Sequence, residues 1–184
     1  MSSNRANSTG MSGTGMSGTR MSSAGMSPSA STLAADVETR EYITVVIRDQ
    51  LFGIPVLQVQ DVLGKQTITR IPLAPEAVAG ALNLRGRIVT AIDGSACLGM
   101  KTSSAPASEL AISVVVEHRG ELYSLVVDAV GEVMPLEVAA LEPNPPTLDP
   151  AWRDISCGVH KLKERLMVVL DIARLLDRVV AVPA

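Results

Sequence analysis

Few side chains in this sequence have the types and spacing that catalysis needs. Asp93 and Asp171 each end an apolar, strand-like run, at corresponding places in the two halves of the chain. Two carboxylates can act as general acid and general base. A helix N-cap or a turn-closing acceptor explains both more simply, particularly for Asp171, which a helical pattern directly follows. The two histidines, His118 and His160, fall at predicted hairpin turns, where we expect surface side chains.

The sequence indicates no metal or cofactor site. Cys97 and Cys157 are far apart and lack the CxxC or His-rich neighbourhood of a zinc site. We therefore expect two free thiols in a reducing compartment. Dinucleotide-binding, P-loop, zinc-protease and serine-hydrolase motifs are missing. These observations favour binding over catalysis and predict a protein that is not an enzyme.

Composition excludes further classes of partner. One Trp, two Tyr and one Phe leave little aromatic surface on which bases or sugars could stack. The net charge is −3 and no stretch is densely basic, so we expect no nucleic-acid partner. No apolar run approaches the roughly 18 residues of a membrane span, and the N-terminus lacks the apolar core of a signal peptide. We expect a cytoplasmic protein without direct membrane insertion.

The chain divides into a polar tail and a β-rich domain. Residues 1–35 are rich in Ser, Gly, Thr, Ala and Met, and every acidic residue lies at or after Asp36. Such a segment cannot bury enough surface to offset its ordering entropy, which predicts a disordered tail. A tethering arm for an acidic partner is the alternative. We expect residues 36–184 to form the folded domain, and the 47% apolar content of the whole chain allows a packed core.

From Tyr42 onward, short runs rich in Val and Ile alternate with turn residues, which is typical of strands in a barrel or sandwich. One helical turn is predicted near Glu76 and one helix over 172–180, and the prolines of 143–150 predict a stiff loop. The predicted strands lie near residues 42–48, 51–57, 67–71, 81–85, 87–93, 110–117, 121–128, 132–137, 155–160 and 165–171.

The sequence contains an internal echo. Residues 52–62 align with 123–133 at an offset of 71, and 87–93 align with 165–171 at an offset of 78. Similar composition in two unrelated hairpins could give one such match, but two matches in the same order favour two similar units. We predict an all-β fold of two tandem five-stranded barrels. The first covers about 40–100 and the second about 108–180, and strand exchange between them is left open.

The most distinctive stretch, Gly80–Val89, reads GALNLRGRIV and puts Asn, Arg and Gly at the tip of an apolar hairpin. It is similar to the G-x-x-N-L-R-G-x-I-[VI] signature of the CheW domain, the adaptor that couples chemoreceptors to the chemotaxis histidine kinase. Phe52–Val62 resembles the family's [FY]-x-[IL]-x-x-x-x-V-x-[ED]-[IV] segment, and 122–130 and 166–176 match its second half. The resemblance covers about 40–178.

The sequence departs from the family pattern at a few positions. Thr90 replaces a usual proline, and Gly94 a usual leucine. Asp61 stands where Glu is commoner, and Ser124 where Gly is frequent. None of these removes a core position. Asp61 lies in the region that family members use for partner contacts, and Ser124 lies near it in the internal echo, so these two departures concern partner specificity.

The resemblance implies two SH3-like barrels with a C-terminal helix, and a non-catalytic adaptor that uses no cofactor. Family members dock on the regulatory domain of the kinase and hold the hairpin tip of the chemoreceptor in a groove between the barrels. Which residue faces which partner is left open. The partner-binding residues carried over onto this sequence are Asn83, Leu84, Arg85, Gly86, Val59, Asp61, Val62 and Ile112.

The same resemblance implies recruitment from the cytoplasm to membrane-associated receptor arrays. Two alternatives to the chemotaxis adaptor are kept. One is a scaffold of the same kind in a chemosensory pathway whose output is not motility. The other, from a different class, is a small hydrolase or metal protein on a β-barrel.

The tail prediction can be tested by limited proteolysis of the free protein. Because residues 1–35 contribute almost no apolar surface with strand or helix period, we expect a resistant fragment that begins between Val37 and Tyr42. Mass spectrometry of the fragment identifies its first residue. Protection of Arg20 from trypsin would contradict the prediction.

Overall fold

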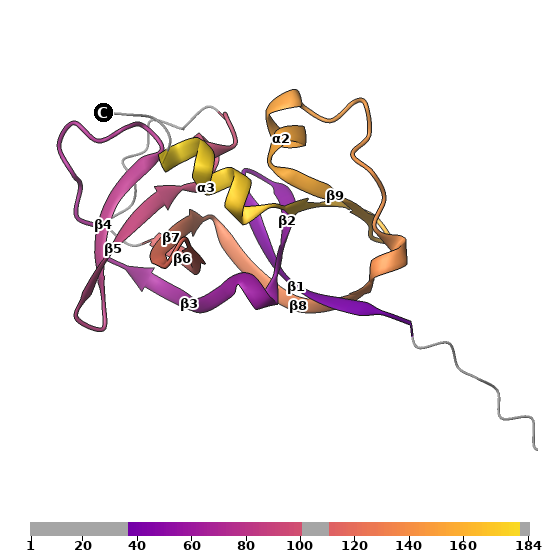
Figure 1. Ribbon diagram of the computed structural model, residues 1–184, viewed down its shortest axis with the longest axis horizontal. Coiled ribbons are helices and arrows are strands. Elements are labelled where there is room, and N and C mark those ends of the chain that lie inside the picture. Colours follow the sequence, from indigo (N-terminus) through magenta and orange to yellow (C-terminus); the bar gives the residue numbers. More distant parts are fainter. Residues whose placement is uncertain (1–36, 101–110, 181–184) are drawn as a thin grey trace, which may run out of the picture. The chain divides into compact units, whose positions relative to one another are not determined.

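The computed structural model describes residues 37–100 and 111–180 (Figure 1). The tail predicted for 1–35 lies outside them and stays a prediction. The described residues form ten strands in two five-stranded sheets, with few helices, which confirms the all-β class and the C-terminal helix. None of the described helices is both long and apolar enough to cross a bilayer.

The strands are β1 (Thr39–Ile47), β2 (Gln50–Pro55), β3 (Val59–Gln66), β4 (Val78–Leu84), β5 (Arg87–Asp93), β6 (Ala111–His118), β7 (Glu121–Val127), β8 (Ala129–Glu137), β9 (Ser156–Lys161) and β10 (Leu166–Leu170). The helices are α1 (Gly94–Cys97), α2 (Pro150–Asp154) and α3 (Ile172–Val180), and two 3-10 turns are η1 (Val56–Gln58) and η2 (Val138–Ala140).

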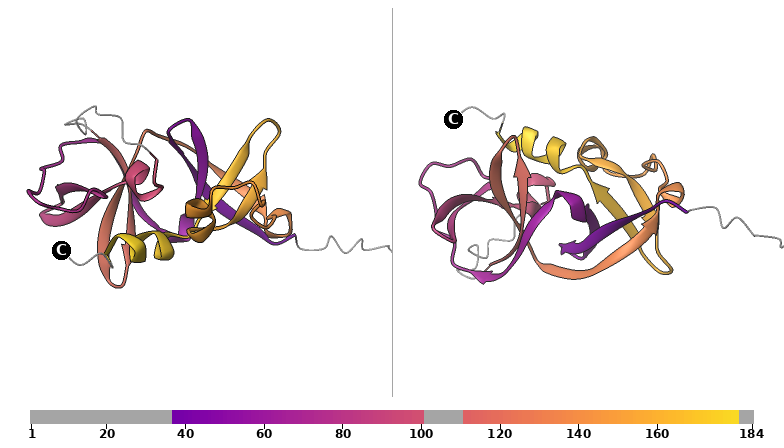
Figure 2. Two further views of the ribbon diagram at one scale, coloured as in Figure 1. Left: turned by 90° about the horizontal axis from the view of Figure 1, so that it is seen from above. Right: turned by 60° about the horizontal axis from the view of Figure 1, so that its bottom comes forward.

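Along the chain, the strands of one sheet lie on both sides of a continuous run of strands that forms the other. One sheet has the order β8-β1-β2-β10-β9 and is called here the terminal barrel, and the other has the order β3-β6-β7-β5-β4 and is called the central barrel. The backbone crosses from one to the other at η1 and again at Asp128, between β7 and β8 (Figures 1 and 2). The sequential division at about residues 100–108 is therefore wrong, because strands pair through their backbones and the pairing need not follow chain order.

The second half of the chain repeats the first, with strands exchanged. Each barrel combines the first hairpin of one half (β1–β2 or β6–β7) with the last three strands of the other half. In the parallel ladders, Phe52 lies opposite Val168 and Tyr123 lies opposite Thr90. These pairs are related by the same offsets, 71 and 78, as the sequence echo. The echo thus marks two copies of one five-stranded unit that have exchanged their first hairpins.

In each barrel, the segment that follows one edge strand, β3 or β8, bridges to the strand at the other edge of the sheet and closes the barrel. Thr69 bridges Ala81 on β4, and Glu142 bridges Val159 on β9, in both cases through two backbone hydrogen bonds of 2.8 to 2.9 Å. The residue before each bridged position, Gly80 before Ala81 and Gly158 before Val159, makes this close approach possible because it has no Cβ. A Cβ on Gly80, whose φ is +151°, would lie 2.3 Å from the Thr69 carbonyl oxygen. Gly158 occupies the equivalent position on β9 with a φ of +156°.

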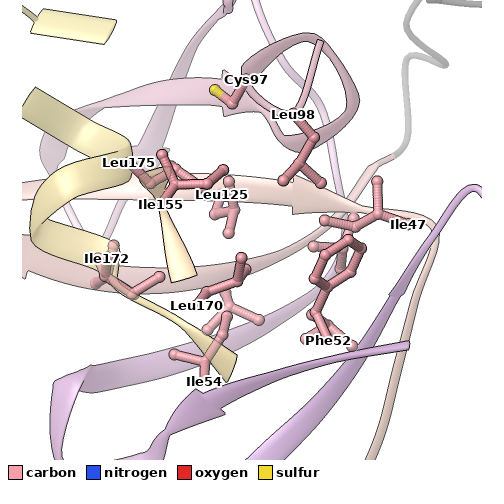
Figure 3. Packing of buried hydrophobic residues seen from close by; sticks show 14 of the residues in the cluster. Ile47, Phe52, Ile54, Cys97, Leu98, Leu125, Ile155, Leu170, Ile172 and Leu175 are labelled. Carbon is pink, nitrogen blue, oxygen red and sulfur yellow. The ribbon is translucent and has the colours of Figure 1, made fainter. Parts of the chain in front are cut away.

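The largest apolar cluster lies between the two sheets, not inside either barrel. Strands β1, β2 and β10 of the terminal barrel and β5, β6 and β7 of the central barrel contribute to it, together with α3. Figure 3 shows Phe52, Leu125 and Leu170 in this cluster. Trp152 on α2 packs edge-on against Phe52, with ring centroids 5.4 Å apart, and its Nε1 donates to the Leu98 carbonyl at 2.9 Å. Each barrel interior holds only a small separate cluster.

Several local predictions are wrong. The third strand, placed at 67–71, is β3 at Val59–Gln66, because the apolar run through Val62 and Leu63 continues directly after η1. The helical turn near Glu76 is a reverse turn, and β4 already begins at Val78. The helices α1 and α2 were not predicted, since four or five residues are too few for a periodic pattern. The α3 prediction is confirmed at both ends.

The acidic and histidine candidates for catalysis have structural roles. Asp93 caps α1, accepting from the Ser95 and Ala96 backbone N–H groups at 2.8 and 3.3 Å, and Asp171 accepts from the Arg174 N–H at 3.1 Å at the start of α3. The N-cap interpretation is confirmed for both.

The predicted surface position is wrong for both histidines. The His118 side chain is only 10% exposed and its Nε2 lies 2.8 Å from Oδ1 of Asp177 on α3. His160 is 2% exposed inside the terminal barrel, packs edge-on against Tyr42, and has no partner at Nε2 among the described residues.

His160 makes the stability of the protein depend on pH. Burial lowers the pKa of His160 below its ordinary value of 6.5, because the barrel interior disfavours the charged ring. The unfolded chain binds the proton more readily, so this contribution to stability is complete above about pH 6.5 and is lost as the pH falls toward the lowered pKa. The loss is at most about 1.4 kcal/mol per pH unit for one group.

We expect chemical denaturation to give a free energy of unfolding that falls between pH 7.5 and 5.5 more steeply for the wild type than for His160→Gln. Equal slopes for the two proteins would show that His160 is not the group responsible.

Candidate partner-binding site

The β4–β5 hairpin ends in a two-residue turn. Leu84 pairs with Arg87, and the turn residues Arg85 and Gly86 have φ values of +52° and +87°. Positive φ at both positions identifies a type I′ turn, whose twist matches that of the strands. The Asn83 Oδ1 accepts the Gly86 N–H at 2.7 Å and so fixes the turn from the preceding strand. Asn83 and Gly86 therefore shape the turn, which presents the Arg85 side chain.

Arg85 forms an ion pair with Asp61. Its Nη2 lies 2.9 Å from Asp61 Oδ2, while Asp61 Oδ1 accepts the Val62 N–H at 2.9 Å. Asp61 lies on β3 and Arg85 follows β4, and these strands are at opposite edges of the central sheet. The ion pair thus spans the gap between the two edges. Two candidates 24 positions apart in the sequence are in direct contact.

Exposure decides what this ion pair can contribute. The Arg85 side chain is 83% exposed and that of Asp61 is 29% exposed. Exposed ion pairs of this kind stabilise proteins by about 0 to 1 kcal/mol. The pair is thus a minor part of stability. Its other effect is to hold a guanidinium group, most of whose donors still face solvent, in one orientation at the tip, where a partner could accept from it.

The other candidate residues do not all lie beside the hairpin turn. Val62 is 41% exposed beside Asp61, and the half-buried Leu84 packs against the small cluster inside the central barrel. Val59 and Ile112 are half-buried and pack against the core between the sheets. They lie toward opposite ends of the β3–β6 ladder, since Val59 pairs with Val116 and Ile112 is four residues away on β6, about 13 Å. The structure thus groups Asp61, Val62 and the hairpin turn, and places Ile112 apart from them.

Ser124, which stands where the family pattern frequently has Gly, is buried too deeply to contact a partner. Its side chain is fully buried, and its hydroxyl donates to the buried Ser113 Oγ at 2.7 Å. This pair satisfies two polar groups inside the central barrel. The partner-specificity interpretation is therefore wrong for Ser124.

Sequence reasoning missed the exposed apolar residues near the site. Ile88, two residues after the turn, is 84% exposed, and Leu57 in η1 is 92% exposed. Both belong to apolar runs that predict strands, and a run does not show which side chain points outward where a strand twists or ends. For Ile88 a signal existed, since it is part of the signature that follows the turn.

The cysteines offer no reactive thiolate. Burial, together with the nearby Asp93 carboxylate, raises the pKa of the Cys97 thiol to about 12. Partial burial, and to a smaller extent the charge of Asp171, also raise the pKa of Cys157. Both cysteines are free. Within residues 37–100 and 111–180, no three His, Cys, Asp or Glu side chains come together as a metal site would require.

Known proteins share this fold and this sequence pattern. The family model described as CheW-like domain matches residues 41–180. The chemotaxis protein CheW of Klebsiella aerogenes is 30% identical over 151 residues, which is 81% of this chain and 89% of that protein. A probable chemotaxis protein CheW of Rhizobium etli is 29% identical, over 74% of this chain and 86% of that protein.

A solved structure gives the same answer. The scaffolding protein TtCheW of Thermoanaerobacter tengcongensis superposes with a TM-score of 0.65 and 28% identity, covering 75% of this chain and 92% of that one. These relatives bear the names of chemotaxis and scaffolding proteins and not of enzymes, in agreement with the prediction of a non-catalytic chain. With a family model that matches most of its length and a relative of 30% identity, the chain belongs to the CheW-like domain family.

Proposed function

We propose that this chain is a non-catalytic adaptor that couples chemoreceptors to the chemotaxis histidine kinase CheA. Its two partners are the regulatory domain of the kinase and the cytoplasmic hairpin tip of the receptor, and it is recruited from the cytoplasm to receptor arrays at the membrane. The observation that carries the proposal is the exposed Arg85–Asp61 ion pair. It joins the turn of the Gly80–Val89 signature to the Phe52–Val62 segment on one surface.

The fold suits a mechanical role. Each barrel contains strands from both halves of the chain, and the two barrels pack on one apolar core, so surfaces on different barrels keep a fixed geometry relative to one another. A change in how a receptor packs against one surface therefore displaces the other surface as part of the same rigid body. No covalent step in this chain is needed, because both contacts are between proteins.

Reconstitution tests the proposal directly. Purified protein is combined with the kinase and the receptor cytoplasmic fragment of its own organism, and ATP-dependent autophosphorylation of the kinase is followed over time. We expect receptor-dependent activation only when this protein is present. Activation that is the same without it would rule out the coupling function.

Arg85→Glu tests the contact itself. The substitution replaces a weak exposed ion pair by a like-charge pair, so we expect a Tm within a few degrees of the wild type. We expect at least a thirtyfold loss of affinity for one of the two partners, about 2 kcal/mol, measured by titration calorimetry. Arg87→Glu is the matched control, because Arg87 is also exposed at the hairpin but has no ion pair among the described residues.

A charge-swap variant distinguishes a direct contact between Arg85 and the partner from a role of the ion pair in holding the hairpin. The double variant Asp61→Arg with Arg85→Asp restores the ion pair but reverses the charge that faces the partner. We expect it to retain the stability and not to recover the affinity. Recovery of the wild-type affinity to within about threefold would show that the ion pair acts only by holding the hairpin. A loss of affinity in Arg87→Glu as large as that in Arg85→Glu would show that only general surface charge matters.

A further inference from the structure

His160 stands where the other copy of the repeat has a leucine. At the offset of 78 residues, His160 on β9 corresponds to Leu82 on β4. The residues opposite them in the ladders also correspond, since His160 pairs with Met167 and Leu82 pairs with Val89. Leu82 and Val89 belong to the apolar cluster inside the central barrel, and Met167 belongs to the one inside the terminal barrel. A titratable ring therefore occupies a core position that the fold elsewhere fills with an aliphatic side chain.

The surroundings of the His160 ring suit its neutral form. The residue is 2% exposed, and the ring lies edge-on to Tyr42, with centroids 5.4 Å apart. A backbone hydrogen bond joins the ring to Ala140 in η2, and Nε2 has no partner among the described residues. A neutral ring that donates from its other nitrogen leaves only a lone pair at Nε2. Protonation places an N–H donor and a positive charge there, where the described residues offer no acceptor.

Neighbouring charged groups do not balance the charge of a protonated ring. Tyr42 is the titratable side chain in contact with it. Burial lowers the pKa of His160, and the Ala140 hydrogen bond acts in the opposite direction. The charged residues on the segments around the ring are exposed to solvent: Arg40 and Glu41 on β1, Glu137 on β8, Glu142 after η2, Lys161 on β9 and Arg165 before β10. Glu142 and Lys161 pair with each other at 2.8 Å.

The closure of the terminal barrel is a short pairing beside His160. Glu142 and Val159 form an isolated bridge of two backbone hydrogen bonds, each 2.9 Å long, between the segment after η2 and β9. On its other side, β9 pairs with β10 at five positions. The ring is hydrogen-bonded to Ala140, two residues before the bridge. A ring that turns toward water therefore breaks the Glu142–Val159 bridge before it breaks the β9–β10 ladder.

We propose that His160 is a pH-sensitive latch on the terminal barrel: when the ring takes up a proton, the segment from Val138 to Glu142 separates from β9, while the ladders of both barrels and the core between them stay folded. The separation lets the charged ring reach water and uncovers Leu141, which lies over Gly158. Below about pH 6.5 the open form binds the proton more readily than the closed form, so acid favours opening.

This latch is distinct from a general loss of stability at low pH. A local opening needs less free energy than global unfolding, so it is populated while the rest of the protein remains native. Polar residues placed against the local pattern of a fold are where function is to be sought. A histidine whose charged form is unfavourable in one state and favourable in another is the usual basis of a pH sensor. The latch works in the absence of any partner.

The central barrel provides an internal control. Its closure, the Thr69–Ala81 bridge, also consists of two backbone hydrogen bonds, and Leu82 stands there in place of His160. Amide hydrogen exchange of the full-length protein is measured by NMR at pH 7.5 and 5.5, and each rate is corrected for the intrinsic effect of pH. The Glu142 and Val159 N–H groups both donate in the bridge, so their protection factors measure its opening.

We expect the protection of the Glu142 and Val159 amides to fall about three- to tenfold from pH 7.5 to 5.5. Tenfold is about the limit for one proton and one pH unit below 6.5. At pH 5.5 both amides should exchange faster than the slowest amides of β2 and β10, because the opening is local. The Thr69 and Ala81 amides should keep their protection within about twofold.

Three variants assign the effect to one side chain. His160→Leu gives the terminal barrel the residue of the other copy, and we expect the protection of Glu142 and Val159 to change less than about twofold with pH. His160→Gln keeps a polar side chain that does not titrate in this range, should behave in the same way, and keeps the test valid if leucine disturbs the packing. His118→Gln is the matched control, because it removes the histidine that contacts α3, and it should show the wild-type fall.

Other outcomes contradict the latch in distinguishable ways. Protection that does not depend on pH in the wild type, or that falls equally in both His160 variants, would show that His160 does not control the closure. An equal fall at Thr69 and Ala81, or exchange of Glu142 and Val159 only as slow as that of the slowest amides, would show global unfolding instead. None of these outcomes bears on the proposed coupling function, because no partner is present in the experiment.

Discussion

The exchange of strands between the two barrels is the constraint on which the rest of the structure depends. Neither barrel is complete without strands from the other half of the chain, and the main core lies between the sheets, not within them. Each barrel interior alone contains only a few buried apolar side chains. The shared core therefore supplies most of the apolar burial, and it also sets the geometry between surfaces on different barrels. The proposed coupling function, which works by position, needs this rigidity.

The repeat was visible in the sequence, but the exchange was not. The echo between 52–62 and 123–133 follows from side-chain pattern, which the two halves share. Which hairpin pairs with which strands is decided by backbone hydrogen bonds that leave no such pattern. Turns were easier to predict, because Arg-Gly at 85–86 and at 119–120 has the residue types of a type I′ hairpin. The buried position of His160 was missed because a polar residue between turn signals resembles a surface residue.

At the candidate site, too, some features could be predicted from the sequence and others could not. The NLRG signature and Asp61 could be found from the sequence, and their contact explains why both belong to one surface. The exposure of Leu57 could not be found, because an apolar run does not show which side chain points outward where a strand ends.

Native-state hydrogen exchange of a Val168→Ala variant tests the shared core most directly. Val168 is buried on β10 of the terminal barrel and faces the core between the sheets. Because both barrels depend on this core, we expect the slowest amides of β5 and β6 in the central barrel to lose the same protection as those of β2 and β10, about 1 to 3 kcal/mol. Loss confined to β1, β2 and β8–β10, with wild-type protection throughout β3–β7, would show two independent barrels and contradict the account.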